Sequence, residues 1–169
     1  MSGTIAPASD QDLPEVLKIY NEVIRTSTAV YTEVEFTAER GAAWFGAKRS
    51  AGLPFIVAKD ASGVTGFGTF GEFRAPPCYQ HSVEHSVHVR SDRRGQGIGR
   101  QLVVELMNLA VAMHKHVMIA GIDADNDVSI KLHESLGFIT VGHFHEVGYK
   151  FGRWLDLVFL ECRLPATKL

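Results

Sequence analysis

Residues 94–100 of this 169-residue chain read Arg-Gly-Gln-Gly-Ile-Gly-Arg, a composition suited to binding an anion. This segment follows the strand-like alternation that ends at Val89, and it precedes an apolar stripe of helical spacing that begins at Leu102. Glycines let a ligand approach the backbone closely, and the first N–H groups of a helix have no partner within the helix. Because the helix dipole adds positive charge at this end, the segment predicts an anion site at a strand-to-helix turn.

Two common phosphate-binding patterns do not fit this turn. A dinucleotide fingerprint that starts at Gly95 would need a third glycine where the chain has Arg100. A P-loop would need Gly-Lys-Ser/Thr five residues after its first glycine, and the chain does not supply it. The spacing present is Arg94-x-x-Gly97-x-Gly99. Glycines and arginines also make ordinary strand-to-helix turns, so the spacing alone leaves that alternative open.

One arginine and several histidines are the other residues with evident chemical potential. Arg74 follows a predicted strand, where its guanidinium can hold a carboxylate through two hydrogen bonds or can simply be solvated. His114-x-His116 stands at the end of a predicted helix. No cysteine or carboxylate cluster completes a site with any histidine, so we expect no metal. The eight histidines are His81, His85, His88, His114, His116, His133, His143 and His145.

Composition narrows the class of protein. The 17 basic and 19 acidic residues give a formal charge of −2, which argues against a general nucleic-acid binder. No apolar run approaches the roughly 20 residues of a membrane span, and the first residues lack the apolar segment of a signal peptide. Cys78 and Cys162 are too few for a disulfide scaffold. We expect one domain over residues 1–169, located in the cytoplasm, with neither nucleic acid nor a membrane as its partner.

Strands and helices alternate around these residues. Capping residues and apolar periodicity predict helices from Ser9-x-x-Asp12 to about Thr26, from Thr37 to about Ser50, from the glycine-rich turn to about Met113, and from Asn126 or Asp127 to Gly137. The predicted strands are Thr4–Ala6, Phe55–Lys59, Val64–Glu72, Ser82–Val89, Val117–Ile122, Phe138–Val141 and Leu157–Leu164. The predicted loops are Ser27–Phe36, which is either a plain connection or a lid, Phe73–Tyr79, and Glu146–Asp156. This order indicates an α/β domain with a mixed sheet.

Several stretches of the chain occur together, in order and spacing, in one known group of enzymes. They are Tyr79 with Ser82–Val89, then Arg94–Gly99, then Asn126-x-x-Ser129 with Leu132–Phe138, and finally Val147–Asp156. The chain thereby resembles the phosphinothricin and methionine sulfoximine branch of the GNAT superfamily of N-acetyltransferases. The resemblance implies a GNAT-like mixed, mostly antiparallel central sheet flanked by about four helices. It also implies acetyl-CoA as the cosubstrate, with no metal.

For the cosubstrate, the resemblance implies two binding segments and one helix face. The backbone of Val87, His88 and Val89 would pair with the pantetheine arm like an added strand. The turn would hold the pyrophosphate through Arg94, Gly95, Gln96, Gly97, Ile98, Gly99 and Arg100. Asn126 would contact the cosubstrate near the thioester, and Ser129 shares its helix face. Asn126 can instead be a plain N-cap and Ser129 a solvated helix residue.

For the reaction, the resemblance implies transfer of an acetyl group to the α-amine of a small amino acid or analogue. Methionine sulfoximine, methionine sulfone and phosphinothricin are the candidate class. Glu84 would be the general base, and His133 is the second candidate. Glu84 can instead be a strand carboxylate paired with a cation, and His133 a helix-surface residue. The substrate would be contacted by Phe73, Arg74, Ala75, Tyr31 and Lys150.

The resemblance also implies a homodimer with substrate pockets near the subunit interface. Two alternatives remain open for the function: acetylation of a protein N-terminus or lysine, and a non-catalytic CoA-binding regulatory module that could dispense with Glu84. The chain departs from the family at His88, where a tyrosine is common, and in the segments Glu35–Thr37 and Pro76–Cys78. These departures leave the acetylated amino acid undetermined.

Overall fold

Seven strands form one sheet in the computed structural model, which describes residues 3–165. The strands are β1 (Thr4–Pro7), β2 (Phe55–Asp60), β3 (Gly63–Glu72), β4 (Ser82–Val89), β5 (Val117–Asp123), β6 (Ile139–Lys150) and β7 (Arg153–Arg163). Their spatial order is β1-β2-β3-β4-β5-β7-β6. The neighbours β4 and β5 run parallel, and the other neighbouring pairs run antiparallel. The predicted mixed, mostly antiparallel sheet is therefore confirmed.

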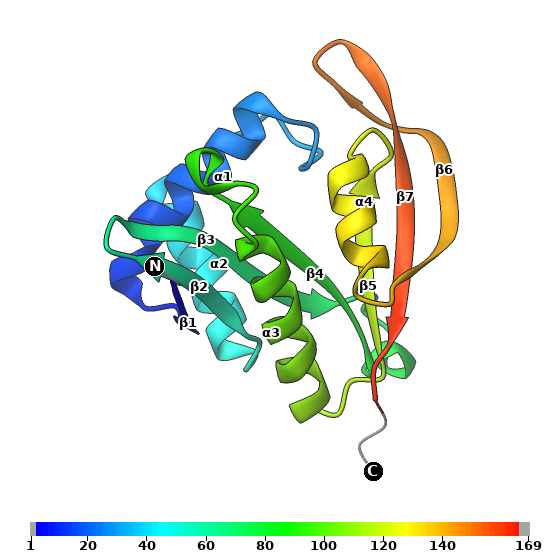
Figure 1. Ribbon diagram of the computed structural model, residues 1–169, viewed down its shortest axis with the longest axis horizontal. Helices are drawn as coiled ribbons and strands as arrows, with labels where there is room; N and C mark the ends of the chain where they lie inside the picture. Colours follow the sequence, from blue (N-terminus) through cyan, green and yellow to red (C-terminus); the bar gives the residue numbers. More distant parts are fainter. Residues whose placement is uncertain (1–2, 166–169) are drawn as a thin grey trace.

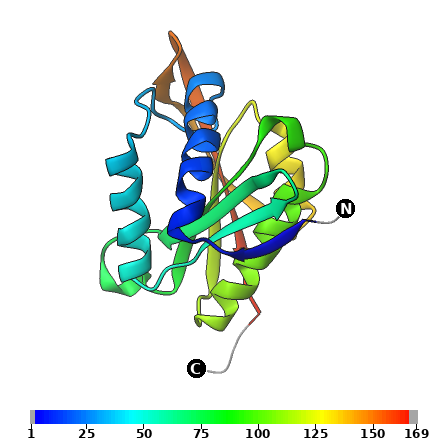
Figure 2. The ribbon, with the colours of Figure 1, turned by 90° about the vertical axis from the view of Figure 1, so that its left-hand side faces the viewer.

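Four α-helices cover the two faces of this sheet. They are α1 (Leu13–Thr26), α2 (Ala38–Ser50), α3 (Ile98–Ala112) and α4 (Asp127–Glu134). Helices α1 and α2 lie on one face, and α3 and α4 lie on the other (Figures 1 and 2). Strand β2 shows why both faces are covered: Phe55 and Val57 pack in the core with α1 and α2, whereas Ile56 and Ala58 pack in the core with α3. Among the described residues, no helix has the length and apolar character to cross a membrane.

Helix α3 is held against the sheet by the apolar stripe read from the sequence. Leu102, Val103, Leu106 and Ala110 are fully buried against strands β2–β5. Burying one such leucine contributes about 1.5–3 kcal/mol, so this stripe anchors the helix firmly. Gly97 caps the helix with φ +80°, a left-handed conformation that glycine adopts without strain. The first turn of α3 is therefore held in a fixed position at the end of β4.

Strands β4 and β5 pair only along their first residues. Their register runs from Ser82 opposite Val117 to Glu84 opposite Ile119. Beyond this point the two strands diverge, as Figure 1 shows, while β4 remains paired with β3 as far as Val89. The divergence opens a gap in the sheet and frees the β5-facing backbone groups of β4 from Glu84 onward. This gap sets the position of the site.

The predicted loop over Glu146–Asp156 is wrong. Strands β6 and β7 continue through it and form a long hairpin, in which Lys150 pairs with Arg153. The connection is the two-residue turn Phe151–Gly152, with φ +53° and +75°, as in a type I′ turn. Two register shifts, at Thr140/Gly142 and at Phe144/Gly148, interrupt the alternation of side chains. The periodicity that predicts a strand is therefore absent from this part of the sequence.

Candidate active site

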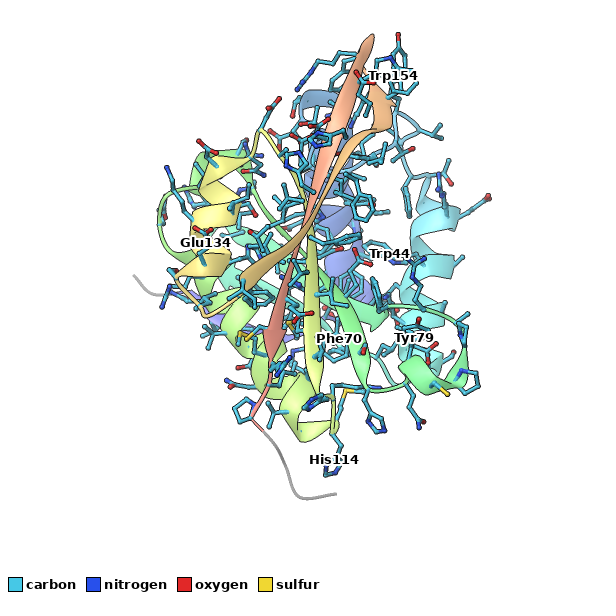
Figure 3. All side chains as sticks on the ribbon, turned by 90° about the vertical axis from the view of Figure 1, so that its right-hand side faces the viewer. Trp44, Phe70, Tyr79, His114, Glu134 and Trp154 are labelled. Atoms are coloured by element: carbon cyan, nitrogen blue, oxygen red, sulfur yellow. The ribbon has the colours of Figure 1, made fainter. Side chains whose placement is uncertain are left out.

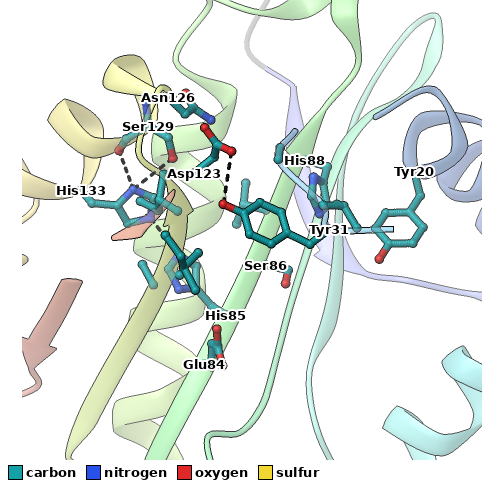
Figure 4. A pocket seen from close by; sticks show the side chains of 17 residues that line it. Tyr20, Tyr31, Glu84, His85, Ser86, His88, Asp123, Asn126, Ser129 and His133 are labelled. Atoms are coloured by element: carbon teal, nitrogen blue, oxygen red, sulfur yellow. Dashed lines mark hydrogen bonds between the residues drawn. The ribbon is translucent and has the colours of Figure 1, made fainter. Parts of the chain in front are cut away.

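A cavity of about 340 Å³ occupies the gap between β4 and β5. It is bounded by the diverging ends of these strands, the first turn of α4, the loop after α1, and single residues of α1 and β7 (Figure 4). Its lining consists of Tyr20, Ala29, Val30, Tyr31, Glu84, His85, Ser86, Val87, His88, Ala120, Gly121, Ile122, Asp123, Asn126, Ser129, His133 and Leu157. The cavity has the size expected of a small-molecule site.

Glu84 lies in this cavity where the pairing of β4 and β5 ends. Its side chain is partly buried, and burial raises the pKa of its carboxyl group, while the charge of Arg74 acts in the opposite direction. Gly121 on β5 leaves room for this carboxylate, because a Cβ atom at that position would lie 3.0 Å from Glu84 Oε1. A carboxylate with a raised pKa, inside a cavity and next to unpaired strand edges, is suited to accept a proton from a bound amine.

His133 is joined to a second buried histidine that the sequence analysis assigned no role. The Nε2 atoms of His85 and His133 lie 2.9 Å apart. The Nδ1 atom of His85 lies 3.0 Å from the carbonyl oxygen of Ile119, and the Nδ1 atom of His133 lies 2.7 Å from that of Ser129. In the 2.9 Å contact one Nε2 atom donates and the other accepts. Burial lowers the pKa of both rings, so this hydrogen belongs to a neutral tautomer of one ring and not to an added proton.

Burial, followed by the repulsion of His133, lowers the pKa of His85 to about 4, and burial also lowers the pKa of His133. The two rings therefore do not both become cations at neutral pH. All four ring nitrogens have protein partners, so His133 has no lone pair directed at the cavity. As a candidate base, His133 is disfavoured by this geometry, which instead suits a positioning role.

Two more cavity residues have neutral side chains at physiological pH. His88 packs beside Tyr20 and Phe67, at 5.4 and 5.2 Å between ring centres. Burial, aided by the charge of Arg94, lowers the pKa of His88 to about 4. Burial and the carboxylate of Asp123 raise the pKa of the Tyr31 hydroxyl. These rings thus form uncharged walls.

The loop over residues 27–37 closes one side of the cavity, and the β6–β7 hairpin holds it there. The Tyr31 hydroxyl lies 2.8 Å from the carbonyl oxygen of Asp156 and 3.2 Å from Asp123 Oδ2. The ring lies on Gly148, where a Cβ atom would come within 2.6 Å of it. The backbone N–H of Phe151 donates to Glu33 Oε1. This arrangement fits the lid interpretation of the loop better than that of a plain connection.

Lys150 was predicted to contact the substrate, but in the structure it binds the loop over residues 27–37. Its side chain is 1% exposed, and its Nζ atom donates to the carbonyl oxygens of Ser27 and Val30, both at 2.7 Å. Lys150 also lies outside the cavity lining, so its position does not support the predicted substrate contact. Two of the three ammonium hydrogens are thus donated to carbonyl groups of the loop.

Replacing Lys150 by methionine should lower the free energy of unfolding by about 1.5–3 kcal/mol, because charge-assisted hydrogen bonds are lost while their acceptors stay partly buried. Urea unfolding followed by circular dichroism measures this change. Lys115→Met is the matched control, because Lys115 donates to one carbonyl group, that of Gln80, at an exposed site. Equal stability of the Lys150→Met variant and the wild type would contradict the fastening role.

Three of the other expected substrate residues lie outside the cavity lining. Phe73, Arg74 and Ala75 follow β3, and the Arg74 guanidinium lies over the Phe73 ring at 4.9 Å. The charge of Arg74 nevertheless acts on the Glu84 carboxyl group. Tyr31 is thus the expected substrate residue that lines the cavity in this structure.

Asn126, at the start of α4, has a structural role and also lies in the cavity lining. Its Oδ1 atom accepts the backbone N–H of Ser129 at 3.2 Å, which makes Asn126 the N-cap, and the residue also lines the cavity. Ser129 lines the cavity as well, with its Oγ atom 3.5 Å from His133 Nδ1. The predicted common face of Asn126 and Ser129 is therefore present, and His133 lies on it as well.

The glycine-rich turn has free backbone donors. The first hydrogen bond within α3 runs from Gln101 N–H to the carbonyl oxygen of Gly97, so the N–H groups of residues 98–100 point out of the helix start. Arg93 forms an ion pair with Asp60, whereas Arg94 and Arg100 take part in no ion pair among the described residues. These donors and charges can bind phosphate groups.

Comparison with known proteins supports this chemistry. Residues 5–159 match the family model described as the acetyltransferase (GNAT) domain. The chain is 43% identical to the L-methionine sulfoximine/L-methionine sulfone acetyltransferase of Pseudomonas paraeruginosa, over 99% of this chain and 98% of that protein. It is 34% identical to the phosphinothricin N-acetyltransferase of Alcaligenes faecalis, over 96% and 83% of the two chains. It also superposes on a Salmonella typhimurium protein solved with its cofactor acetyl-CoA, with a TM-score of 0.95, 36% identity, and coverage of 100% and 98%.

Proposed function

The chain belongs to the GNAT acetyltransferases, and from this premise we propose that it transfers the acetyl group of acetyl-CoA to the α-amine of a small amino acid or analogue. Methionine sulfoximine, methionine sulfone and phosphinothricin represent the substrate class, in line with the names of its relatives. The observation that carries the proposal is the cavity of about 340 Å³, which places Glu84 beside the free edge of β4. A space of this size suits a free amino acid.

The residues around the gap fit acetyl-CoA. The β5-facing edge of β4 beyond Glu84, which includes Val87–Val89, offers backbone groups for an extended arm. The N–H groups of residues 98–100, with Arg94 and Arg100, offer donors and positive charge for a pyrophosphate. Asn126 and Ser129 line the cavity. When bound, acetyl-CoA supplies the acetyl thioester.

In the proposed mechanism Glu84 prepares the acceptor amine. An amino acid carries its α-amine mainly as ammonium at neutral pH, and only the neutral amine is a nucleophile. The Glu84 carboxylate takes that proton, directly or through a water molecule. Backbone N–H groups near Val87 polarise the carbonyl group that is attacked. The His85–His133 pair is part of the cavity lining and connects β4 to α4, which positions Ser129 and Asn126.

Arg74 is the proposed partner of the substrate carboxylate. Arg74→Ala should raise KM for the amino acid by about 10–150-fold, because a charge-assisted pair contributes about 1.5–3 kcal/mol. KM for acetyl-CoA should change little. Arg49→Ala is the matched control, since Arg49 is also an exposed arginine over a phenylalanine ring. Equal changes in both KM values would show that Arg74 acts on the structure and not on the substrate.

A steady-state assay of CoA release tests the proposal. The panel contains methionine sulfone, methionine sulfoximine, phosphinothricin, the common amino acids and a peptide with a free N-terminus and a lysine. The proposal expects saturable CoA release with the free amino acids or analogues. Release with the peptide alone would favour a protein acetyltransferase. Acetyl-CoA binding without release for any acceptor would favour a non-catalytic regulatory module.

We further propose a homodimer assembled through the β6–β7 hairpin. Strand β6 is an edge strand, and exposed apolar side chains concentrate on this hairpin. They are Ile139, Val141, Phe144, Val147, Tyr149, Phe151 and Trp154. We expect light scattering at micromolar concentration to give twice the 18.6 kDa chain mass, and Trp154→Glu to shift it toward the monomer. A wild-type monomer under these conditions would contradict the proposal.

A further inference from the structure

Two histidines and one aspartate meet on the β6–β7 hairpin, outside the cavity lining. His143 Nε2 lies 3.0 Å from Asp156 Oδ2, and His145 Nδ1 lies 2.9 Å from the same oxygen. The ligating atoms of the three residues all lie within 4.8 Å of one another. The two imidazole rings stack with their centres 4.3 Å apart. These three side chains therefore converge on one point at the surface.

The cluster depends on the β6–β7 hairpin, which was not predicted from the sequence. With Glu146–Asp156 expected as a loop, no carboxylate had a defined place near the His143-x-His145 pair. In the structure Phe144 pairs with Leu157, which brings the neighbouring Asp156 beside both histidines. The register shift between Phe144 and Gly148 lets two residues of the same strand approach one residue of its partner.

The Asp156 carboxylate is held in place independently of the histidines. Its Oδ1 atom accepts the backbone N–H of Glu146 at 2.9 Å. Glu146 has φ +55°, an uncommon conformation for a residue other than glycine. This bond leaves Oδ2 directed at the two rings. An outer hydrogen bond that orients a carboxylate in this way is a regular feature of metal sites.

The geometry points to a site for one divalent d-block cation, such as Zn²⁺, on His143, His145 and Asp156. Two imidazole nitrogens and one carboxylate oxygen suit zinc, cobalt, nickel or copper, whereas magnesium and calcium prefer oxygen ligands throughout. Ligands at about 2.0–2.1 Å from a tetrahedral ion are roughly 3.3–3.5 Å apart. The two histidine–aspartate separations, 3.0 and 2.9 Å, differ from this spacing by a few tenths of an ångström, and the two histidine nitrogens lie within 4.8 Å of each other. Rotation of the exposed rings can bring the three atoms to the spacing of a bound ion. A water molecule would complete the coordination.

A cation at this site would link β6 to β7 beside the contact between the hairpin and Tyr31 of the loop over residues 27–37. Asp156 provides its side chain to the cluster and its carbonyl oxygen to the Tyr31 hydroxyl. Figure 3 shows the hairpin extending beyond the body of the protein to the turn near Trp154. Since a ligand that binds only the folded chain stabilises it, zinc should raise the melting temperature. This inference stands apart from acetyl transfer, because its readouts are binding and stability.

The chain contains a matched control for this site. His114 and His116 have the same His-x-His spacing and are both exposed. Within residues 3–165, His143, His145 and Asp156 converge as three possible ligands, whereas no such group of three includes His114 or His116. The paired variants H143Q/H145Q and H114Q/H116Q therefore remove equal numbers of histidines. They differ in whether a carboxylate completes the site.

Calorimetric titration of the untagged full-length chain with Zn²⁺ alone tests the inference. We expect one Zn²⁺ per wild-type chain and an unchanged affinity for H114Q/H116Q. The affinity of H143Q/H145Q should fall by at least about tenfold, and its melting temperature should no longer rise with zinc. Mg²⁺ should not compete. Co²⁺ should give a visible absorption band that is absent from H143Q/H145Q.

Three results would overturn the inference. They are no zinc binding by the wild type, undiminished binding by H143Q/H145Q, and equal losses in both double variants. The substituted side chains of H143Q/H145Q are exposed, by 44% and 74%, and circular dichroism verifies that it folds. The single variant H145Q provides the same comparison if the double variant does not fold.

Discussion

Glu84→Gln should lower kcat by about 10²–10⁴-fold, the usual contribution of a general base. The substitution keeps the shape of the side chain and removes its basicity, so the affinity for acetyl-CoA should barely change. Stopped-assay or continuous measurement of CoA release provides kcat, and calorimetry provides the affinity. Glu72→Gln is the matched control, because Glu72 is an exposed carboxylate at the end of the adjacent strand β3. Normal turnover by Glu84→Gln at neutral pH would remove Glu84 from the mechanism.

The pH dependence provides a second, independent signature of the base. Burial raises the pKa of the Glu84 carboxyl group, so the proton-accepting form is lost as the pH falls through this raised value. The wild-type kcat/KM should therefore decrease on the acidic side at a pH above that typical of a free glutamate. In Glu84→Gln this decrease should disappear. Its residual rate should rise with pH, because more of the amine is then neutral in solution.

Gly97→Asp should abolish detectable binding of acetyl-CoA. The residue caps α3 in a left-handed conformation, and a Cβ atom there meets no atom within 4 Å, so the chain has room to fold. The new carboxylate would lie where a pyrophosphate is proposed to bind. Two like charges about 4 Å apart near a protein surface repel by about 4 kcal/mol, which corresponds to almost a thousandfold in affinity. Calorimetric titration with acetyl-CoA measures the loss.

Gly52→Asp separates this effect from backbone strain. Gly52 also has a positive φ, +66°, and open space around its Cβ position, but it lies after α2, away from the turn. The Gly52→Asp variant should lose about as much folding stability as Gly97→Asp and should still bind acetyl-CoA. If Gly97→Asp folds and binds acetyl-CoA tightly, the pyrophosphate does not bind at this turn.

Turns, caps and apolar stripes, each formed by residues close in the sequence, were sufficient to predict most of the helices and strands. The glycine-rich turn, the stripe from Leu102 onward and the cap at Thr37 each specify one element through nearby residues, and each prediction is confirmed. The β6–β7 hairpin could not be predicted in the same way. Its register is shifted twice, so its side chains follow no period of two, and its turn places the non-glycine Phe151 in a left-handed conformation.

The residues of the candidate site also divide into those that could be placed from the sequence and those that could not. Glu84, Asn126, Ser129 and His133 could be placed from their neighbours in the sequence, and the structure brings them to one cavity. His85 had no predicted role, because nothing local reveals that α4 would place His133 against it. Lys150 had the charge of a substrate contact, but long-range packing directs it to the carbonyl groups of the lid loop. Contacts between distant elements decide such roles.

The most direct test of the proposed function is to identify where the acetyl group goes. The enzyme is incubated with acetyl-CoA labelled with ¹³C in the acetyl group and with methionine sulfone, and the products are followed by NMR and mass spectrometry. We predict one acetyl group on the α-nitrogen of the amino acid for each CoA released, with Glu84→Gln slowing both in parallel. Release of CoA with the label recovered as acetate or on the protein itself would contradict the account.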